Sequence, residues 1–178
     1  MFEQLQGARY FAKIDLSDAY WQIKLDADAQ RLCAVNTSRG LFLVTRLQMG
    51  LKNSSAVFQT IMEKEVLKGL SNTLVYQDDS LAHAKTEDSL RKHYNAVLSR
   101  LKEKNMTVNK AKCVQSAKEI KFLGRVISSE GIRPNPELVS RIESLAIPSS
   151  HRELRSLLGL FGYYGRFIDQ YADKLAHM

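Results

Sequence analysis

The sequence has few of the features that build disulfide scaffolds, zinc sites or membrane spans. It contains two cysteines, Cys33 and Cys113, and neither has a Cys or His close to it in the sequence, so no zinc-binding pattern is present. Isolated thiols are typical of a reducing compartment. No apolar run reaches the roughly 18 residues of a transmembrane helix, and the N-terminus lacks the layout of a signal peptide. We therefore expect an intracellular protein, cytoplasmic or nuclear, that is not secreted and has no membrane contact.

The composition is that of a globular domain with a basic surface. Hydrophobic residues make up 44% of the 178 residues, which is enough for a sizeable core. Lys and Arg number 26 against 19 Asp and Glu, so the net charge is +7. This excess suggests a polyanionic partner; the alternative is a merely basic soluble protein. The sequence has no glycine-rich phosphate loop, so a phosphate group would be bound by metal ions and basic side chains.

Three carboxylates follow strand-like stretches. Residues 74–81 carry Asp78 and Asp79 between two short apolar runs, and the composition of these runs favours a β-hairpin with the acids near its tip. Asp15 ends a second strand-like stretch, residues 8–15. Carboxylate oxygens are ligands that Mg²⁺ prefers, and two strand ends that deliver acids suit a two-metal phosphoryl-transfer site. The alternative is a polar hairpin turn without a metal.

Five motifs follow one another along nearly the whole chain. They are FAKIDL with AYWQI (11–23), LQMGLKNSSAVFQ (47–59), YQDD (76–79), FLG with VI and GI (122–132), and ELRSLLGL with YY and RFI (153–168). In this order they resemble the reverse transcriptase of long-terminal-repeat retrotransposons of the Ty3/Gypsy kind, from the palm to the start of the thumb and connection. Each motif alone is weak, but five in sequence are specific.

The resemblance implies an RNA-directed DNA polymerase, which transfers a nucleotide from a deoxynucleoside triphosphate to a primer 3′-hydroxyl. It implies two Mg²⁺ ions as cofactors, with Mn²⁺ as a substitute, and an RNA template and a DNA primer as partners. Asp15, Asp78 and Asp79 would be catalytic and would bind the metals. The backbone carbonyl of Leu16 would be a further metal ligand.

The resemblance also assigns contacts to nucleotide and nucleic acid. The expected nucleotide-binding residues are Tyr20, Met49, Gly50 and Lys52. Tyr20 matches the family's steric gate, an aromatic ring that leaves no room for a ribose 2′-hydroxyl; the alternative is a core aromatic. The expected primer and template contacts are Tyr76, Phe122, Leu123 and Gly124. Phe122 and Leu123 are equally suited to a core, and Asp18 is assigned either to the nucleotide phosphates or to a structural role.

Periodicity predicts the remaining elements. Residues 20–26 alternate in polarity and predict a strand, Asp26 to Gln30 reads as a polar connector, and residues 31–46 predict a hairpin around Ser38–Gly40. Helical spacing predicts one helix over 54–70 and another that begins after Thr86. Together with the acidic hairpin, this order is a split β-α-β layout.

The fold class we predict is α+β, an antiparallel sheet with the acids on one face and two helices packed on the other. The resemblance names this arrangement a polymerase palm and places it at residues 1–132. The composition shifts at Arg133–Pro136, and two helices, capped by Asn135 and by Ser150, are expected from there on. Residues 133–178 are therefore predicted to form a small helical segment like a thumb or connection.

The chain begins at the first catalytic motif, so the resemblance implies that it lacks the N-terminal fingers. An alternative function follows: a truncated or domesticated, catalytically inactive palm whose exposed surface serves dimerisation, protein interaction or nucleic-acid binding. Three places depart from the family's pattern, namely Gln48–Met49, Ser54–Ser55 and Gln77. These departures change the shape expected of the nucleotide pocket but remove no metal ligand.

Overall fold

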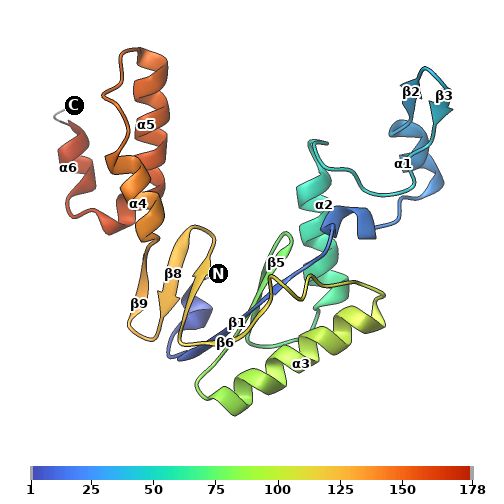
Figure 1. Ribbon diagram of the computed structural model, residues 1–178, viewed down its shortest axis with the longest axis horizontal. Helices are drawn as coiled ribbons and strands as arrows, with labels where there is room; N and C mark the ends of the chain where they lie inside the picture. Colours follow the sequence, from blue (N-terminus) through green and yellow to red (C-terminus); the bar gives the residue numbers. More distant parts are fainter. Residues whose placement is uncertain (1, 177–178) are drawn as a thin grey trace. The chain divides into compact units, whose positions relative to one another are not determined.

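The computed structural model describes residues 2–176 (Figure 1). These residues fall into two compact units that divide between Ile120 and Lys121. The first unit begins with a short 3-10 helix, η1 (Phe2–Leu5), and contains the acidic motifs. Of the helices formed by residues 2–176, none is both long and apolar enough to span a lipid bilayer.

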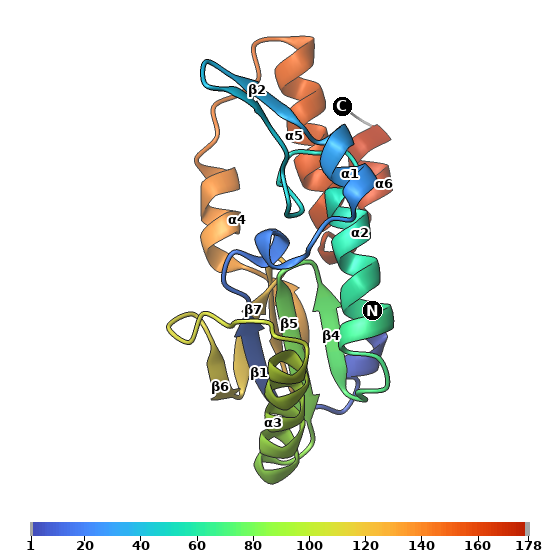
Figure 2. The same cartoon turned by 90° about the vertical axis from the view of Figure 1, so that its right-hand side faces the viewer.

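The first unit is built on a four-stranded antiparallel sheet with the order β4-β5-β1-β6 (Figure 2). Its strands are β1 (Tyr10–Asp15), β4 (Thr73–Tyr76), β5 (Asp79–Ala84) and β6 (Val114–Ala117). Successive side chains of a strand point to opposite faces. In β1, Ala12 and Ile14 therefore share one face of the sheet, while Lys13 and Asp15 share the other.

Two helices pack on the face that carries Ala12 and Ile14. They are α2 (Ser54–Ile61), which continues as the π-helix η3 (Met62–Val66), and α3 (Glu87–Glu103). Their apolar side chains join the sheet in one buried cluster that includes Ala12, Ile14, Phe58, Met62, Val75, Ala82, Leu90, Tyr94, Val97 and Leu101. The predicted α+β fold, with two helices on one face of an antiparallel sheet, is confirmed.

The predicted strand at 20–26 is wrong. Asp18 has a left-handed backbone (φ 45°), and the chain turns there into a 3-10 helix, η2 (Ala19–Gln22). The N–H of Trp21 donates to the carbonyl of Asp18 at 2.9 Å, which closes the tight turn. Residues 23–25 then pair briefly with 45–47, with a bridge between Lys24 and Arg46. The alternating pattern therefore marks a short pairing rather than a whole strand.

The predicted polar connector after residue 26 is a helix instead, α1 (Ala27–Leu32). Asp26 caps it, because its Oδ1 accepts a hydrogen bond from the N–H of Ala29 at 2.8 Å. The predicted hairpin follows in shorter form as β2 (Val35–Thr37) and β3 (Gly40–Phe42). All residues of both strands are exposed. This hairpin is thus a surface feature outside the core.

The second unit consists of a small sheet followed by helices. Its elements are β7 (Glu119–Phe122), which crosses the division, β8 (Arg125–Ser128), β9 (Gly131–Pro134), α4 (Pro136–Glu143), α5 (His151–Tyr164), the 3-10 helix η4 (Gly165–Phe167) and α6 (Tyr171–Ala176). Asn135 caps α4 and Ser150 caps α5, as expected. The strands are in the order β7-β8-β9.

The compact units divide twelve residues before the predicted boundary at 132/133. The reason is that the β7–β8 turn packs with the helices. The hydroxyl of Tyr163 donates to the carbonyl of Leu123 at 2.6 Å, and Asn135 donates through its N–H to the carbonyl of Gly124 at 3.3 Å. Lys121 forms an ion pair with Glu137 at 2.6 Å. The proposal that 133–178 is thumb-like concerns function and stays a prediction.

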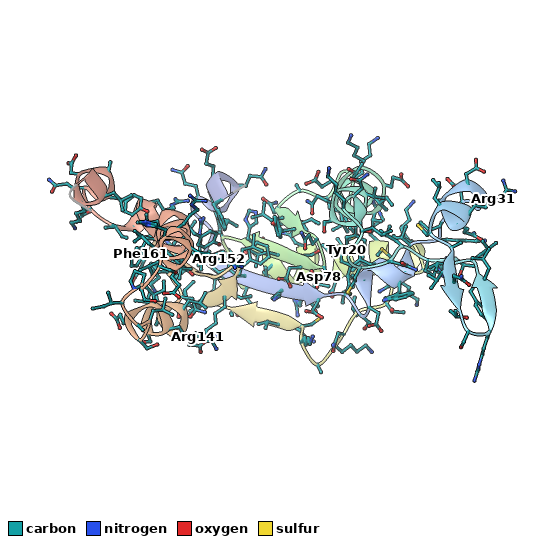
Figure 3. The ribbon with its side chains drawn as sticks, turned by 90° about the horizontal axis from the view of Figure 1, so that it is seen from above. Tyr20, Arg31, Asp78, Arg141, Arg152 and Phe161 are labelled. Carbon is teal, nitrogen blue, oxygen red and sulfur yellow. The ribbon has the colours of Figure 1, made fainter. Side chains whose placement is uncertain are left out.

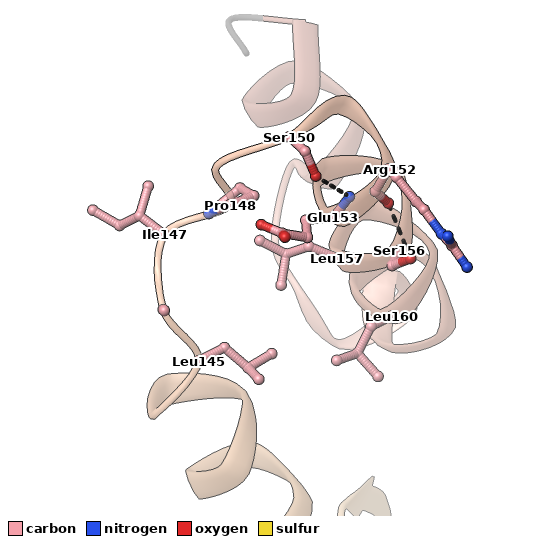
Figure 4. Close-up of a pocket in the computed structure, with 10 residues that line it drawn as sticks. Leu145, Ile147, Pro148, Ser150, Arg152, Glu153, Ser156, Leu157 and Leu160 are labelled. Carbon is pink, nitrogen blue, oxygen red and sulfur yellow. Dashed lines mark hydrogen bonds between the residues drawn. The ribbon is translucent and has the colours of Figure 1, made fainter.

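An apolar pocket of about 610 Å³ lies where the α4–α5 connection faces α5 (Figure 4). Leu145, Ile147, Leu157 and Leu160 contribute apolar surface to it, and Ile147 is 92% exposed. The carboxylate of Glu153 also lines it. The helices of the second unit therefore leave hydrophobic surface uncovered among the described residues.

We expect Phe58→Ala to lower the free energy of unfolding by about 3–5 kcal/mol, because the ring has no exposed surface and its loss leaves a cavity. Chemical denaturation of both proteins measures this difference. The neighbouring Val57 is 42% exposed, so Val57→Ala is the matched control and should change stability by less than about 0.5 kcal/mol. Equal effects of the two substitutions would contradict this packing.

A second prediction concerns His83 of β5, which is 5% exposed. Burial, and to a smaller degree the nearby His93, lower the pKa of His83 below its ordinary value of 6.5. The unfolded chain therefore takes up this proton more readily than the folded chain. The contribution of neutral His83 to the free energy of unfolding is therefore fully present above the pKa of the unfolded chain. It is lost as the pH falls through the lower pKa of the folded chain.

In denaturation series between about pH 7.5 and pH 5.5, His83→Gln should lose less stability than the wild type. His151→Gln, at the exposed start of α5, is the control and should follow the wild-type curve. A His83→Gln curve parallel to that of the wild type would rule out this role for His83.

Candidate active site

The pairing of β1 with β5 places two of the predicted acids opposite each other. Asp15 and Asp79 are direct partners in the antiparallel register, and Cβ atoms of such partners lie roughly 4.5–5.5 Å apart. Both residues are on the face of the sheet away from α2 and α3. Two carboxylates therefore face one side of the sheet at its end.

Lys13 balances part of this negative charge. Its Nζ lies 2.8 Å from Oδ1 of Asp79, and both side chains are about a quarter exposed, 23% and 24%. Lys13 is two residues before Asp15, so the period of a strand puts it on the same face. Sequence reasoning did not single out Lys13, although that spacing is the signal by which it could be found.

The hairpin between β4 and β5 carries Asp78 at a two-residue turn. Tyr76 pairs with Asp79, which leaves Gln77 and Asp78 between the strands. Gln77 has a positive φ of 54°, and a turn with positive φ at its first central residue is usually type II′ with glycine there. A glutamine in this conformation is strained. The side chain of Asp78 is exposed at this turn (Figure 3).

The side chain of Gln59, from α2, holds the backbone of this turn. Its Oε1 accepts a hydrogen bond from the N–H of Gln77 at 2.6 Å, and its Nε2 donates to the carbonyl of Val75 at 3.0 Å. The same Nε2 lies 2.6 Å from the carboxylate of Glu63. Gln59 therefore ties the acidic hairpin to the helix layer and compensates the strain at Gln77.

The backbone around Asp15 is held from two sides. The N–H of Leu16 donates to the carbonyl of Asp78 at 3.4 Å, which connects β1 to the acidic turn. On the other side, the N–H of Asn109 donates to the carbonyl of Asp15 at 2.9 Å. The N–H of Asp15 donates to Sγ of Cys113 at 3.5 Å. The backbone around Asp15 is thus held by two segments that are distant in the sequence, the acidic turn and the stretch that carries Asn109 and Cys113.

Tyr20 is packed in the core and hydrogen-bonded. Its side chain is 9% exposed, its ring centroid lies 5.1 Å from that of Phe58, and its hydroxyl lies 3.0 Å from Oγ of Ser55. These contacts fix the ring between η2 and α2 (Figure 3). Tyr20 therefore packs against the core of the first unit, and its role at the nucleotide sugar stays a prediction.

The other predicted nucleotide-binding residues lie in the loop before α2. Met49 is 61% exposed and Lys52 is also exposed. Gly50 has a positive φ of 88°, a conformation that glycine adopts without a steric penalty. Tyr76, a predicted primer contact, is exposed at the end of β4. Met49, Lys52 and Tyr76 are thus accessible to a ligand, and their part in nucleotide or primer binding stays a prediction.

The predicted primer-grip residues lie at the end of β7 and in the β7–β8 turn, at the start of the second unit. Leu123 and Gly124 have positive φ values of 48° and 70°, the pattern of a type I′ hairpin turn. Phe122 is buried. This turn belongs to the second unit, whereas the acids belong to the first. A role of the turn in primer binding stays a prediction.

The donor atoms at the acidic end of the sheet suit a hard cation. Carboxylate and backbone carbonyl oxygens are ligands of Mg²⁺ and not of a structural zinc site. Across residues 2–176, no three His, Cys, Asp or Glu side chains lie close enough together to form a ready-made metal site. The register nevertheless supplies a pair of carboxylates on one face, so metal binding by Asp15, Asp78, Asp79 and the Leu16 carbonyl stays a prediction.

Comparison with known proteins identifies the family to which the chain is similar. A model of the family "Reverse transcriptase (RNA-dependent DNA polymerase)" matches residues 1–127. The chain is 37% identical over 175 residues to a retrovirus-related Pol polyprotein from transposon 297 of Drosophila melanogaster, and this match covers 96% of the chain and 16% of that polyprotein. It is 31% identical over 178 residues to the transposon Tf2-3 polyprotein of Schizosaccharomyces pombe, with 99% of the chain and 13% of the polyprotein covered.

Solved structures show the same fold. The chain superposes on a foamy viral protease-reverse transcriptase in complex with double-stranded DNA with a TM-score of 0.84 and 28% identity, over 93% of this chain and 29% of that one. A complex of the foamy viral enzyme with an RNA/DNA hybrid matches with a TM-score of 0.77 and 29% identity, over 88% and 21% of the two chains. The predicted resemblance to retrotransposon reverse transcriptases is confirmed.

We expect Gln59→Leu to loosen the acidic turn, because it leaves the N–H of Gln77 and the carbonyl of Val75 without this partner. A cost of about 1–3 kcal/mol in local stability is typical for such a loss. Amide hydrogen exchange at Gln77 measures it and should accelerate. Gln115→Leu, an exposed position of β6, is the control, and unchanged exchange at Gln77 in Gln59→Leu would contradict the clamp.

Proposed function

Because the chain belongs to the reverse transcriptase family of long-terminal-repeat retrotransposons, we propose that it acts as an RNA-directed DNA polymerase domain. The reaction is the addition of a deoxynucleotide to the 3′-hydroxyl of a DNA primer on an RNA template. The chain spans only 13–16% of the transposon polyproteins to which it is similar.

The observation that carries this proposal is the register of β1 and β5, which sets Asp15 opposite Asp79. Asp78 lies on the adjoining turn and is exposed to a ligand. We assign metal binding and catalysis to these three carboxylates, with the Leu16 carbonyl as an additional ligand. When bound, two Mg²⁺ ions would neutralise the charge that develops on the attacking 3′-oxygen and on the leaving pyrophosphate.

The chain's own residues prepare the site for this chemistry. Lys13 offsets the repulsion between Asp15 and Asp79 through its 2.8 Å ion pair with Asp79. Asp79 is thus engaged by a cation of the protein, which supports Asp15 and Asp78 as the main metal ligands and a more peripheral role for Asp79. Gln59 keeps Asp78 in place through the backbone of the turn.

Nucleotide selection is assigned to Tyr20, with Met49, Gly50 and Lys52 as further contacts. The ring of Tyr20 is held by Phe58 and Ser55, so rotation of the side chain would break both contacts. A rigid ring beneath the sugar would exclude a 2′-hydroxyl and favour deoxynucleotides. The positive charge of Lys52 would attract the triphosphate.

Primer and template binding is assigned to Tyr76 in the first unit, and to Phe122 at the end of β7 with Leu123 and Gly124 of the turn that follows. The net charge of +7 supports a nucleic-acid partner, because positive charge attracts the phosphate backbone and makes affinity fall with rising salt. The foamy viral relatives bind double-stranded DNA and an RNA/DNA hybrid, which supports the same class of ligand for this chain.

We expect Asp78→Asn to reduce Mn²⁺ affinity and primer extension by at least about tenfold, because loss of a ligand should cost no less than loss of an outer-shell partner. Extension of a DNA primer on an RNA template, with Mg²⁺ or Mn²⁺, measures the activity. The paramagnetic effect of Mn²⁺ on the amide signals measures binding independently of activity.

The matched control is Asp88→Asn, an exposed carboxylate in the first turn of α3, which should match the wild type. A folded wild-type chain that does not extend the primer with either metal would overturn the proposed activity. The alternative of a non-catalytic palm would then stand. Equal extension by Asp78→Asn and the wild type would overturn the assignment of the site.

A further inference from the structure

Gln22, the last residue of η2, makes an unusual set of side-chain contacts next to the acids. Its Oε1 accepts a hydrogen bond from the N–H of Thr107 at 2.8 Å, and its Nε2 donates to the carbonyl of Thr107 at 3.0 Å. The same Nε2 also donates to the carbonyl of Ser17. One side chain thus binds both backbone groups of one residue and a carbonyl of a second segment.

The partners require this orientation of the amide. The carbonyl oxygens of Thr107 and Ser17 only accept hydrogen bonds, and the N–H of Thr107 only donates. The oxygen of Gln22 must therefore face the N–H, and its nitrogen must face both carbonyls. Since the amide is the side-chain group that combines an acceptor with two donors, an apolar side chain of the same length cannot replace it.

These contacts extend a short pairing between the segment after β1 and the loop after α3. The N–H of Ser17 donates to the carbonyl of Thr107 at 3.1 Å, and that of Asn109 donates to the carbonyl of Asp15 at 2.9 Å. Leu16 forms an isolated bridge with Val108 between them. The pairing ends at Ser17 because the chain turns at Asp18 into η2. Gln22 reaches back from η2 and supplies the contacts that a longer strand would have made.

We propose that Gln22 is a positioning residue for the metal-binding end of β1. It fixes the backbone from Asp15 through Ser17, and with it the carboxylate of Asp15 and the carbonyl of Leu16. It also fixes the start of η2, on which Tyr20 lies. This inference rests on the proposed function, because the position of this backbone matters for a ligand only if Asp15 and Leu16 bind the metal.

The test is Gln22→Met, which keeps the length of the side chain and removes all three hydrogen bonds. Hydrogen exchange at the Thr107 amide should accelerate, because its acceptor is lost. The affinity for Mn²⁺ alone, measured by its broadening of the amide signals near Asp15 and Asp78, should fall roughly tenfold, as for loss of an outer-shell partner.

Gln22→Glu is the second variant, because it keeps the acceptor for Thr107 and the shape of the side chain. Its added negative charge by itself would strengthen cation binding. Weaker Mn²⁺ binding than in the wild type would therefore report lost positioning. Stronger binding would overturn the inference.

Gln30→Met is the matched control. Gln30 also donates a side-chain hydrogen bond to a backbone carbonyl, that of Leu25 at 2.8 Å, but it does so in α1. Its Mn²⁺ affinity should equal that of the wild type. If Gln22→Met binds Mn²⁺ with wild-type affinity despite faster exchange at Thr107, this inference is overturned, while the proposed function still stands. Absence of Asp78-dependent Mn²⁺ binding in the wild type would instead overturn the proposed function and, with it, this inference.

Discussion

The antiparallel register of β1 and β5 is the constraint on which the site depends. It sets Asp15 directly opposite Asp79, and like charges in such a pair are destabilising. The structure offsets this cost locally through Lys13 and supplies stability on the other face, where Phe58, Met62 and the α3 side chains bury the sheet. A slip of one residue would turn Asp15 into that core, so the packing that stabilises the fold also enforces the geometry of the acids.

The two glutamines, Gln22 and Gln59, show how the rest of the unit serves this register. Each side chain binds the backbone of a segment that carries acids: Gln59 binds the β4–β5 turn, and Gln22 binds the carbonyl of Ser17 after β1. Both replace contacts that regular secondary structure would make. Strain at Gln77 and the turn at Asp18 are tolerated because side chains from neighbouring elements satisfy the backbone there.

Much of the fold follows from local signals. The hairpin with Asp78 and Asp79, the helix capped by Thr86 and the helices capped by Asn135 and Ser150 were predicted because cap and strand chemistry is encoded within a few residues. The strand at 20–26 and the connector at 26–30 were wrong. In the first case a left-handed residue, Asp18, interrupts the alternating pattern. In the second, Asp26 caps α1 and Asp28 lies in its first turn, so acidic residues that look like a polar connector start a helix.

The sequence by itself determined the family, the fold class and the identity of the candidate acids, because ordered motifs and periodicity are properties of the chain alone. Tertiary structure decided which residues support them: the ion pair of Lys13 with Asp79, the burial of Tyr20 against Phe58 and the bonds of Gln22 to Thr107. The last of these joins residues 85 positions apart. Periodicity reports which face a side chain occupies and not what lies across from it, so such partners emerge only when the chain has folded.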